Sequence, residues 1–156
     1  MRPVVPEVPM AQVRRFDHVG ITVADLGAVT AFFVGIGLEV DGGPMPIEGE
    51  FLDTVIGMTG ARTRIVMLRP PGGGTCLELS TFERPDHAPS QPGAMANALG
   101  LRNVAFEVDD LDGLVERLAA DGWGLVGGVG RYEDAWRMAY VRGPEGLLVS
   151  LAQRLG

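Results

Sequence analysis

The pattern of hydrophobic and polar residues defines a structural unit near the start of the chain. Over residues 16–24, apolar and polar side chains alternate, which predicts a β-strand with one face on a core. Asp25 then suits a helix N-cap, because its carboxylate can accept the free N–H groups of the first turn. Apolar residues follow at helical spacing, and Gly35 and Gly37 end the predicted helix.

The same unit occurs again 85 positions further along the chain. The stretch "LRNVAFEVDDL" (101–111) repeats the alternation, and Asp110 stands where Asp25 stood. Asn103 takes the place of His18, so the histidine is kept only in the first copy. A supersecondary unit that is used twice predicts one domain made of two modules.

Each unit continues with extended segments, so each module is predicted to be β-α-β-β-β. The turns "RPPGGG" (69–74) and "RGPEG" (142–146) precede the last strand of each module. The Pro/Gly-rich segment 83–100 joins the modules, and residues 41–50 are expected to form a loop that could cover a site. The further strands are predicted near residues 51–58, 63–69, 75–82, 123–129, 136–142 and 147–153.

The first and last strands of each module carry polar residues on the face opposite the aliphatic one. "GTCLELS" (74–80) matches "GLLVSLA" (146–152), so Ser150 corresponds to Glu78. A concave sheet face with a few polar groups among small side chains is suited to a small-molecule site. The four polar positions are His18, Glu78, Asn103 and Ser150.

The motifs "DHVGITVADL", "LELS", "NVAFEVDDL" and "RGPEGLLVSL" resemble those of the vicinal oxygen chelate superfamily, which includes glyoxalase I, methylmalonyl-CoA epimerase, extradiol dioxygenases and bleomycin-resistance proteins. The resemblance implies an α+β fold, in which two βαβββ modules form a cupped mixed sheet with helices on its outer face. It covers residues 14–154, after an expected flexible tail over residues 1–13. The expected parts are module one (14–83), a linker (84–100) and module two (101–154).

In metal-using members of that superfamily, the first and the last strand of each module each supply one metal ligand. Carried onto this chain, His18 and Glu78 are competent metal ligands, whereas Asn103 stands where a His is usual and Ser150 where a Glu is usual. A catalytic zinc site normally has three strong protein ligands, and a hard cation prefers more carboxylates. No cofactor is therefore firmly implied, and a divalent metal (Zn, Ni, Mn or Fe) is the alternative.

Without a metal, His18 and Glu78 are expected to pair, and such a pair could act as acid and base. The favoured function is a small-molecule-binding protein similar to glyoxalase and bleomycin-resistance proteins, with a degenerate metal site. The alternative is a metal-dependent lyase or isomerase that acts next to a carbonyl. An extradiol dioxygenase fits less well, because its iron site requires two His and one carboxylate.

Other residues are weaker candidates. Met138 and Tyr140 share one strand parity with Trp136, and are predicted either to line the pocket or to pack in the core. "RPPGGGT" lacks the Lys-Ser/Thr of a phosphate-binding loop. Cys76 is expected to be inert packing and His87 a solvated loop residue. An epimerase-like acid or base could come from Glu48, Glu50 or Asp53 near the lid, and the alternative for these carboxylates is surface charge.

The composition of the chain limits the classes of binding partner and the cellular location that we expect. The net charge of −7 argues against binding to nucleic acid or to anionic membranes. No apolar run approaches the ~20 residues that span a bilayer, and a single cysteine is typical of a cytoplasmic protein. The N-terminal segment is not predicted to be a signal peptide, and Met10 is an alternative start to Met1. By resemblance, a homodimer is expected.

Overall fold

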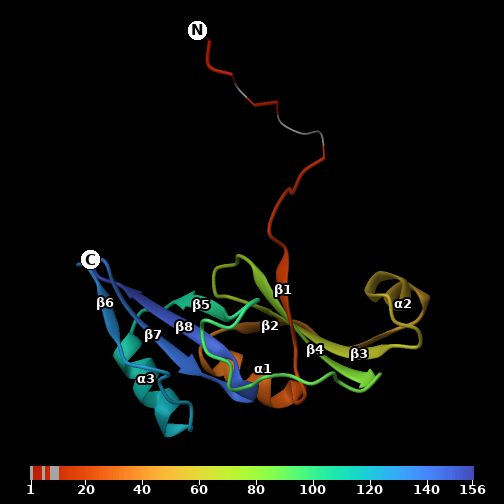
Figure 1. Ribbon diagram of the computed structural model, residues 1–156. Coiled ribbons are helices and arrows are strands. Elements are labelled where there is room, and N and C mark those ends of the chain that lie inside the picture. Colours follow the sequence, from red (N-terminus) through yellow and green to blue (C-terminus); the bar gives the residue numbers. More distant parts are fainter. Residues whose placement is uncertain (1, 5, 8–10) are drawn as a thin grey trace.

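The computed structural model describes residues 2–4, 6–7 and 11–156 (Figure 1). The two candidate starts, Met1 and Met10, lie outside the described residues, as does part of the predicted tail. The first module contains β1 (His18–Thr22), α1 (Leu26–Gly35), β2 (Glu39–Glu48), α2 (Glu50–Ile56), β3 (Arg62–Arg69) and β4 (Cys76–Arg84). The second module contains β5 (Asn103–Glu107), α3 (Leu111–Ala120), β6 (Gly130–Tyr132), β7 (Trp136–Arg142), the short 3-10 turn η1 (Pro144–Gly146) and β8 (Leu148–Arg154).

Each module forms its own four-stranded mixed sheet. The strand orders are β1-β4-β3-β2 and β5-β8-β7-β6, so the second sheet repeats the topology of the first. The first strand of each module runs parallel to the last, and the other neighbours are antiparallel. The predicted α+β fold of two βαβββ modules is therefore confirmed, with α2 as an addition between the second and third strands of the first module.

The repeated helix caps are present in both modules. The Asp25 carboxylate accepts a hydrogen bond from the Ala28 N–H at 3.0 Å, and Asp110 accepts one from the Gly113 N–H at the same distance. The first helix ends at Gly35, and Gly37 follows with φ +119°, a conformation that favours glycine. The local sequence thus determines where these two helices begin and where the first one ends.

Two predicted segments of the first module are wrong. Most of the loop predicted over 41–50 belongs to β2, and most of the strand predicted over 51–58 is occupied by α2. β2 is an edge strand with irregular pairing at Gly42, which explains how it accommodates Pro44 and Pro46. α2 ends at Gly57, whose left-handed conformation caps it.

The strand predicted at 123–129 is also wrong. Its only pairing among the described residues is a single bridge from Leu125 to Val141, and the strand β6 starts later, at Gly130. Glycines at 124, 127 and 128 weaken the segment as a strand, because they have no side chains to pack and lose the most backbone entropy on folding. The second sheet is consequently narrow at its outer edge.

The two modules share one hydrophobic core, in which α1 is central. The Phe33 ring lies 6.2 Å from the Phe106 ring in an edge-on arrangement, and Phe32 lies 5.7 Å from Trp123. These contacts join a helix of the first module to β5 and the segment after α3. Figure 1 shows the two sheets extending on either side of α1. β1 and β5 are both edge strands, and no pairing joins the two sheets within the described ranges.

No helix in the described part of the chain is long and apolar enough to cross a membrane.

Candidate functional site

His18 and Glu78 meet on the open face of the first sheet. The parallel register of β1 and β4 places His18 beside Cys76 and Gly20 beside Glu78. The space beside Gly20 is open, since a Cβ there would contact nothing within 4 Å. The distance from His18 Nε2 to Glu78 Oε2 is 3.5 Å, and the two side chains are 37% and 29% exposed. The predicted pairing of these residues is present.

The other ring nitrogen of His18 contacts a carboxylate that the sequence analysis missed. His18 Nδ1 lies 2.7 Å from Asp17 Oδ2, and Arg15 lies 2.8 Å from the other oxygen of Asp17. The hydrogen bond from His18, followed by the charge of Arg15, lowers the pKa of Asp17 below its ordinary value. Asp17 precedes His18 directly in "DHVG", so the signal was an acidic neighbour of the candidate histidine.

The predicted residues of the second module form a separate group. Asn103 Nδ2 donates to the Tyr140 hydroxyl at 3.3 Å, and Tyr140 stands opposite Ser150 on the neighbouring strand. Met138 is 39% exposed, whereas Ser150 is only 2% exposed. No hydrogen bond or ion pair in the described part of the chain joins this group to His18 or Glu78. The chain therefore carries two half-sites, on two different sheets.

The first half-site has features of a metal site, but the whole donor set does not fit one. Two ligand atoms about 2.1 Å from one tetrahedral zinc ion lie roughly 3.4 Å apart, close to the His18–Glu78 spacing. A carboxylate on the second imidazole nitrogen, as Asp17 provides, is also typical of metal-binding histidines. The second half-site, however, offers only neutral groups, and Ser150 is buried. Among the described residues, no three His, Cys, Asp or Glu side chains cluster as a metal site requires.

Two cavities accompany these half-sites. A groove of about 1000 Å³ runs between the modules, and its lining includes Cys76 from β4 and Ala105 from β5. A smaller cavity of about 390 Å³ lies at the ends of β1 and β4 and includes His87, which the sequence placed in a solvated loop. His87 is exposed but ordered by the chain, because its Nε2 accepts a hydrogen bond from the Phe82 N–H at 2.9 Å.

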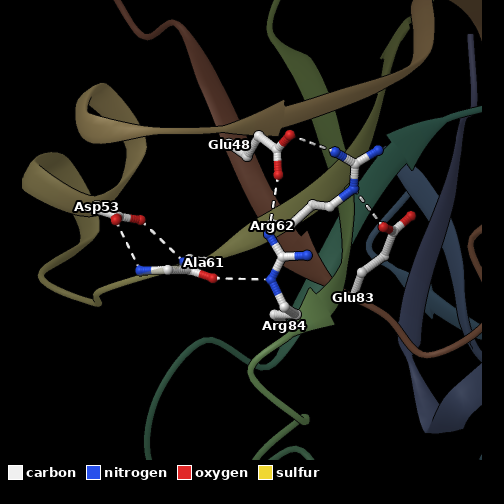
Figure 2. A network of polar contacts seen from close by, with 7 residues as sticks. Glu48, Asp53, Ala61, Arg62, Glu83 and Arg84 are labelled. Carbon is white, nitrogen blue, oxygen red and sulfur yellow. Dashed lines mark hydrogen bonds and ion pairs between the residues drawn. The ribbon is translucent and has the colours of Figure 1, made fainter.

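Glu48 and Asp53, two of the acidic residues near the predicted lid, have structural partners (Figure 2). Glu48 lies 2.7 Å from Arg62 and 3.0 Å from Arg84, and Arg62 also contacts Glu83 at 2.6 Å. Asp53 accepts hydrogen bonds from the backbone N–H groups of residues 60 and 61. Glu50 is simply the first residue of α2. These contacts fasten α2 and the turn after it to the end of the first sheet.

Comparison with known proteins agrees with the fold and the repeat. The family model described as "Glyoxalase/Bleomycin resistance protein/Dioxygenase superfamily" matches residues 15–151. No curated protein matches the chain. Among solved structures, a glyoxalase family protein from Bacillus cereus is 38% identical, with a TM-score of 0.91. That match covers 96% of this chain and all of the other.

More distant structures share the fold. The fosfomycin resistance protein FosX from Listeria monocytogenes, in a mutant complexed with Mn(II) and a dihydroxypropylphosphonic acid, is 17% identical with a TM-score of 0.60. The match covers 91% of this chain and 93% of FosX. A domain of the same family description from Frankia is 18% identical, with a TM-score of 0.61 over 94% of this chain and 93% of the other. From the family match over nearly its whole length, this chain belongs to the glyoxalase/bleomycin resistance protein/dioxygenase superfamily.

Proposed function

We propose that this protein binds a small organic molecule on the open faces of its two sheets, with His18 and Glu78 as the polar contacts of the first half-site. The observation that carries the proposal is the Asp17–His18–Glu78 arrangement. The contact with Asp17 orients the imidazole, and the Nε2 atom and the Glu78 carboxylate are left side by side on a partly exposed surface. Nε2 of this neutral imidazole and the Glu78 carboxylate both accept hydrogen bonds, so a substrate or ligand with two donors would match this pair.

The second half-site completes the pocket with a neutral surface. Asn103, Tyr140 and Met138 supply an amide, a phenol and a thioether, which suit an uncharged or weakly polar part of a ligand. Because β1 and β5 are unpaired edges on separate sheets, the two half-sites can face each other if a second chain supplies one of them. We therefore expect a homodimer in which the first module of one chain lies against the second module of the other.

The chain contains only two histidines, which makes the proposal easy to test by NMR. A fragment library screened against the protein should yield compounds that shift the imidazole resonances of His18. Those shifts should disappear in Glu78→Gln, while Glu48→Gln, which removes a carboxylate from the ion-pair network of Figure 2, should leave them unchanged. If bound fragments leave the His18 signals unchanged, the proposed site is wrong.

A second candidate function is supported by the same geometry. The spacing of His18 and Glu78, with Asp17 on the other ring nitrogen, also suits two ligands of a divalent metal. Water or substrate oxygens would then have to supply the remaining positions. Such a protein would be a lyase or isomerase that acts on a proton next to a carbonyl, where the metal supplies Lewis-acid polarisation.

The two candidates differ in their response to added metal. A specific ion that binds only the folded protein raises the Tm through linkage. In the second candidate function, Mn²⁺, Ni²⁺ or Zn²⁺ raises the Tm of the wild-type protein, and the effect is absent in His18→Ala and Glu78→Ala. If the protein binds a small molecule without a metal, the three ions leave all Tm values unchanged or change those of wild type and variants equally.

A further inference from the structure

The smaller cavity lies where the two modules and the linker meet. The end of β1 and Phe82 of β4 contribute to one side, residues 85–88 and 90 of the linker to another, and Glu145 of η1 comes from the second module. Met58, which follows α2, also lines it. Its volume of about 390 Å³ lies within the range of small-molecule sites, which often occur at such junctions. His18 and Glu78 do not line this cavity, so it is distinct from the half-site described above.

The hydrophobic part of the lining suits a compact apolar body. Val23 is buried in the core behind the cavity, whereas Met58 is 47% exposed and Phe82 is partly exposed. The Phe82 ring meets the His87 ring edge-on, with centroids 6.2 Å apart. An aromatic ring and a thioether at one mouth can contact both apolar groups and the methylenes next to a cation.

The polar part of the lining is negatively charged. The two carboxylate oxygens of Glu145 accept hydrogen bonds from the backbone N–H groups of Ala24 and Asp25, at 2.7 and 2.8 Å. These bonds fix the carboxylate in position and leave lone pairs free for a further donor. Asp86 adds a second carboxylate. Among the described residues that line the cavity, there is no Arg. His87 accepts from the Phe82 N–H through Nε2, so it contributes no positive charge while that bond is made.

From this lining we propose that the junction cavity binds a small organic cation, a primary amine with an aromatic or aliphatic body. The ammonium group contacts the Glu145 and Asp86 carboxylates, and the apolar body lies against Phe82 and Met58. The charge of the cavity selects amines over alcohols and carboxylates of the same shape. Because Glu145 comes from the second module and Phe82 from the first, a bound amine also holds the two modules together.

The test uses 2-phenylethylamine as the probe, with 2-phenylethanol and 3-phenylpropionate as matched neutral and anionic probes. NMR titrations follow the two histidine side chains of the full-length protein separately. The amine should shift the His87 resonances, leave those of His18 unchanged, and bind at least about tenfold more tightly than either matched probe. Equal affinity for amine and alcohol would overturn the proposal, as would amine-induced shifts at His18 alone or at neither histidine.

Variants locate the probe within the cavity. Asp86→Asn should weaken amine binding by about two- to fivefold and leave alcohol binding unchanged, as expected for one exposed ion pair. Phe82→Leu should weaken binding of the amine further, because it removes the aromatic face. Asp109→Asn removes the same charge from the groove between the modules and should have no effect. If Asp86→Asn and Asp109→Asn weaken the amine equally, only the overall negative charge attracts it, and the proposed site is wrong.

This test is independent of the proposed function. Glu78→Gln should abolish fragment-induced shifts at His18 while the amine still shifts His87. Each site can therefore fail without the other.

Discussion

Phe33 of the first module packs edge-on against Phe106 of the second, with ring centroids 6.2 Å apart. Phe33 is fully buried, so the two modules meet in one continuous core rather than at a polar interface. A shared core of this kind predicts a single cooperative unfolding transition. Circular dichroism reports on the secondary structure of both modules, and the fluorescence of Trp123 and Trp136 reports on the second module. The two signals should show the same midpoint in urea.

Phe33→Ala should lower the free energy of unfolding by about 3–5 kcal/mol, because it leaves a cavity between the modules. Phe51→Ala is the matched control. Phe51 is 76% exposed on α2, so its removal should change stability by less than about 0.5 kcal/mol. Two separate transitions in the wild-type protein would contradict the shared core.

Glu145 links the modules through the backbone. Its carboxylate accepts hydrogen bonds from the N–H groups of Ala24 and Asp25, directly before α1 and 121 and 120 residues away in sequence. Glu145→Ala leaves both exposed donors to water and should destabilise the protein by about 0.5–1.5 kcal/mol. Urea unfolding measures this loss, and Glu116→Ala, on the exposed face of α3, serves as the control. Equal stabilities for the two variants would show that the contact contributes nothing.

The ion pairs of Figure 2 predict a specific pH dependence. The hydrogen bond from Arg62, its charge and then the contact with Arg84 hold the pKa of Glu48 below its ordinary value of 4.5. A carboxyl group whose pKa is lowered by folding stabilises the protein above its unfolded pKa, and this contribution disappears as the pH falls through the folded pKa. Glu48→Gln should therefore be less stable than wild type at pH 7 and equally stable at strongly acidic pH.

Urea unfolding at several pH values checks this expectation. The difference between wild type and Glu48→Gln should shrink steadily below pH ~4.5, the ordinary pKa of a glutamate. Glu116→Gln is the control, since Glu116 is exposed on α3. A difference that persists unchanged at acidic pH would mean that the charge of Glu48 does not matter.

The contact between Asp17 and His18 predicts the tautomer of the histidine. With Nδ1 only 2.7 Å from a carboxylate oxygen, the neutral imidazole should carry its proton on Nδ1 and leave the Nε2 lone pair beside Glu78. Nitrogen-15 chemical shifts of the imidazole distinguish the two tautomers. Asp17→Asn should shift His18 toward the Nε2–H form. An Nε2–H tautomer in the wild-type protein would contradict the assigned hydrogen bond.

Local sequence patterns predicted the modules well. The alternation before Asp25 and before Asp110 gave β1 and β5, and both aspartates do cap the helices that follow. The correspondence of Glu78 with Ser150 also holds, since both lie on the last strand of their module, beside the first. These features depend on contacts within a few residues or between neighbouring strands, which composition and period reveal directly.

The errors arose where longer-range contacts decide the structure. Glycines and prolines at 42–46 resembled a loop, but pairing with β3 makes the segment an edge strand. Residues 51–58 lack a clear helical stripe, and their helix relies on Gly57 and on the turn that Asp53 holds. The packing of α1 against the second module joins residues more than 70 positions apart, and no local pattern records it.

In the function proposed here, His18 and Glu78 are a polar ligand-binding pair, and the matching half-site of the second module offers only neutral groups. The most direct test is the metal content of protein purified without a metal-affinity tag, compared with His18→Ala and Glu78→Ala. We predict far less than one equivalent of transition metal in all three. Close to one equivalent in the wild-type protein, lost in both variants, would contradict the claim and identify a working metal centre.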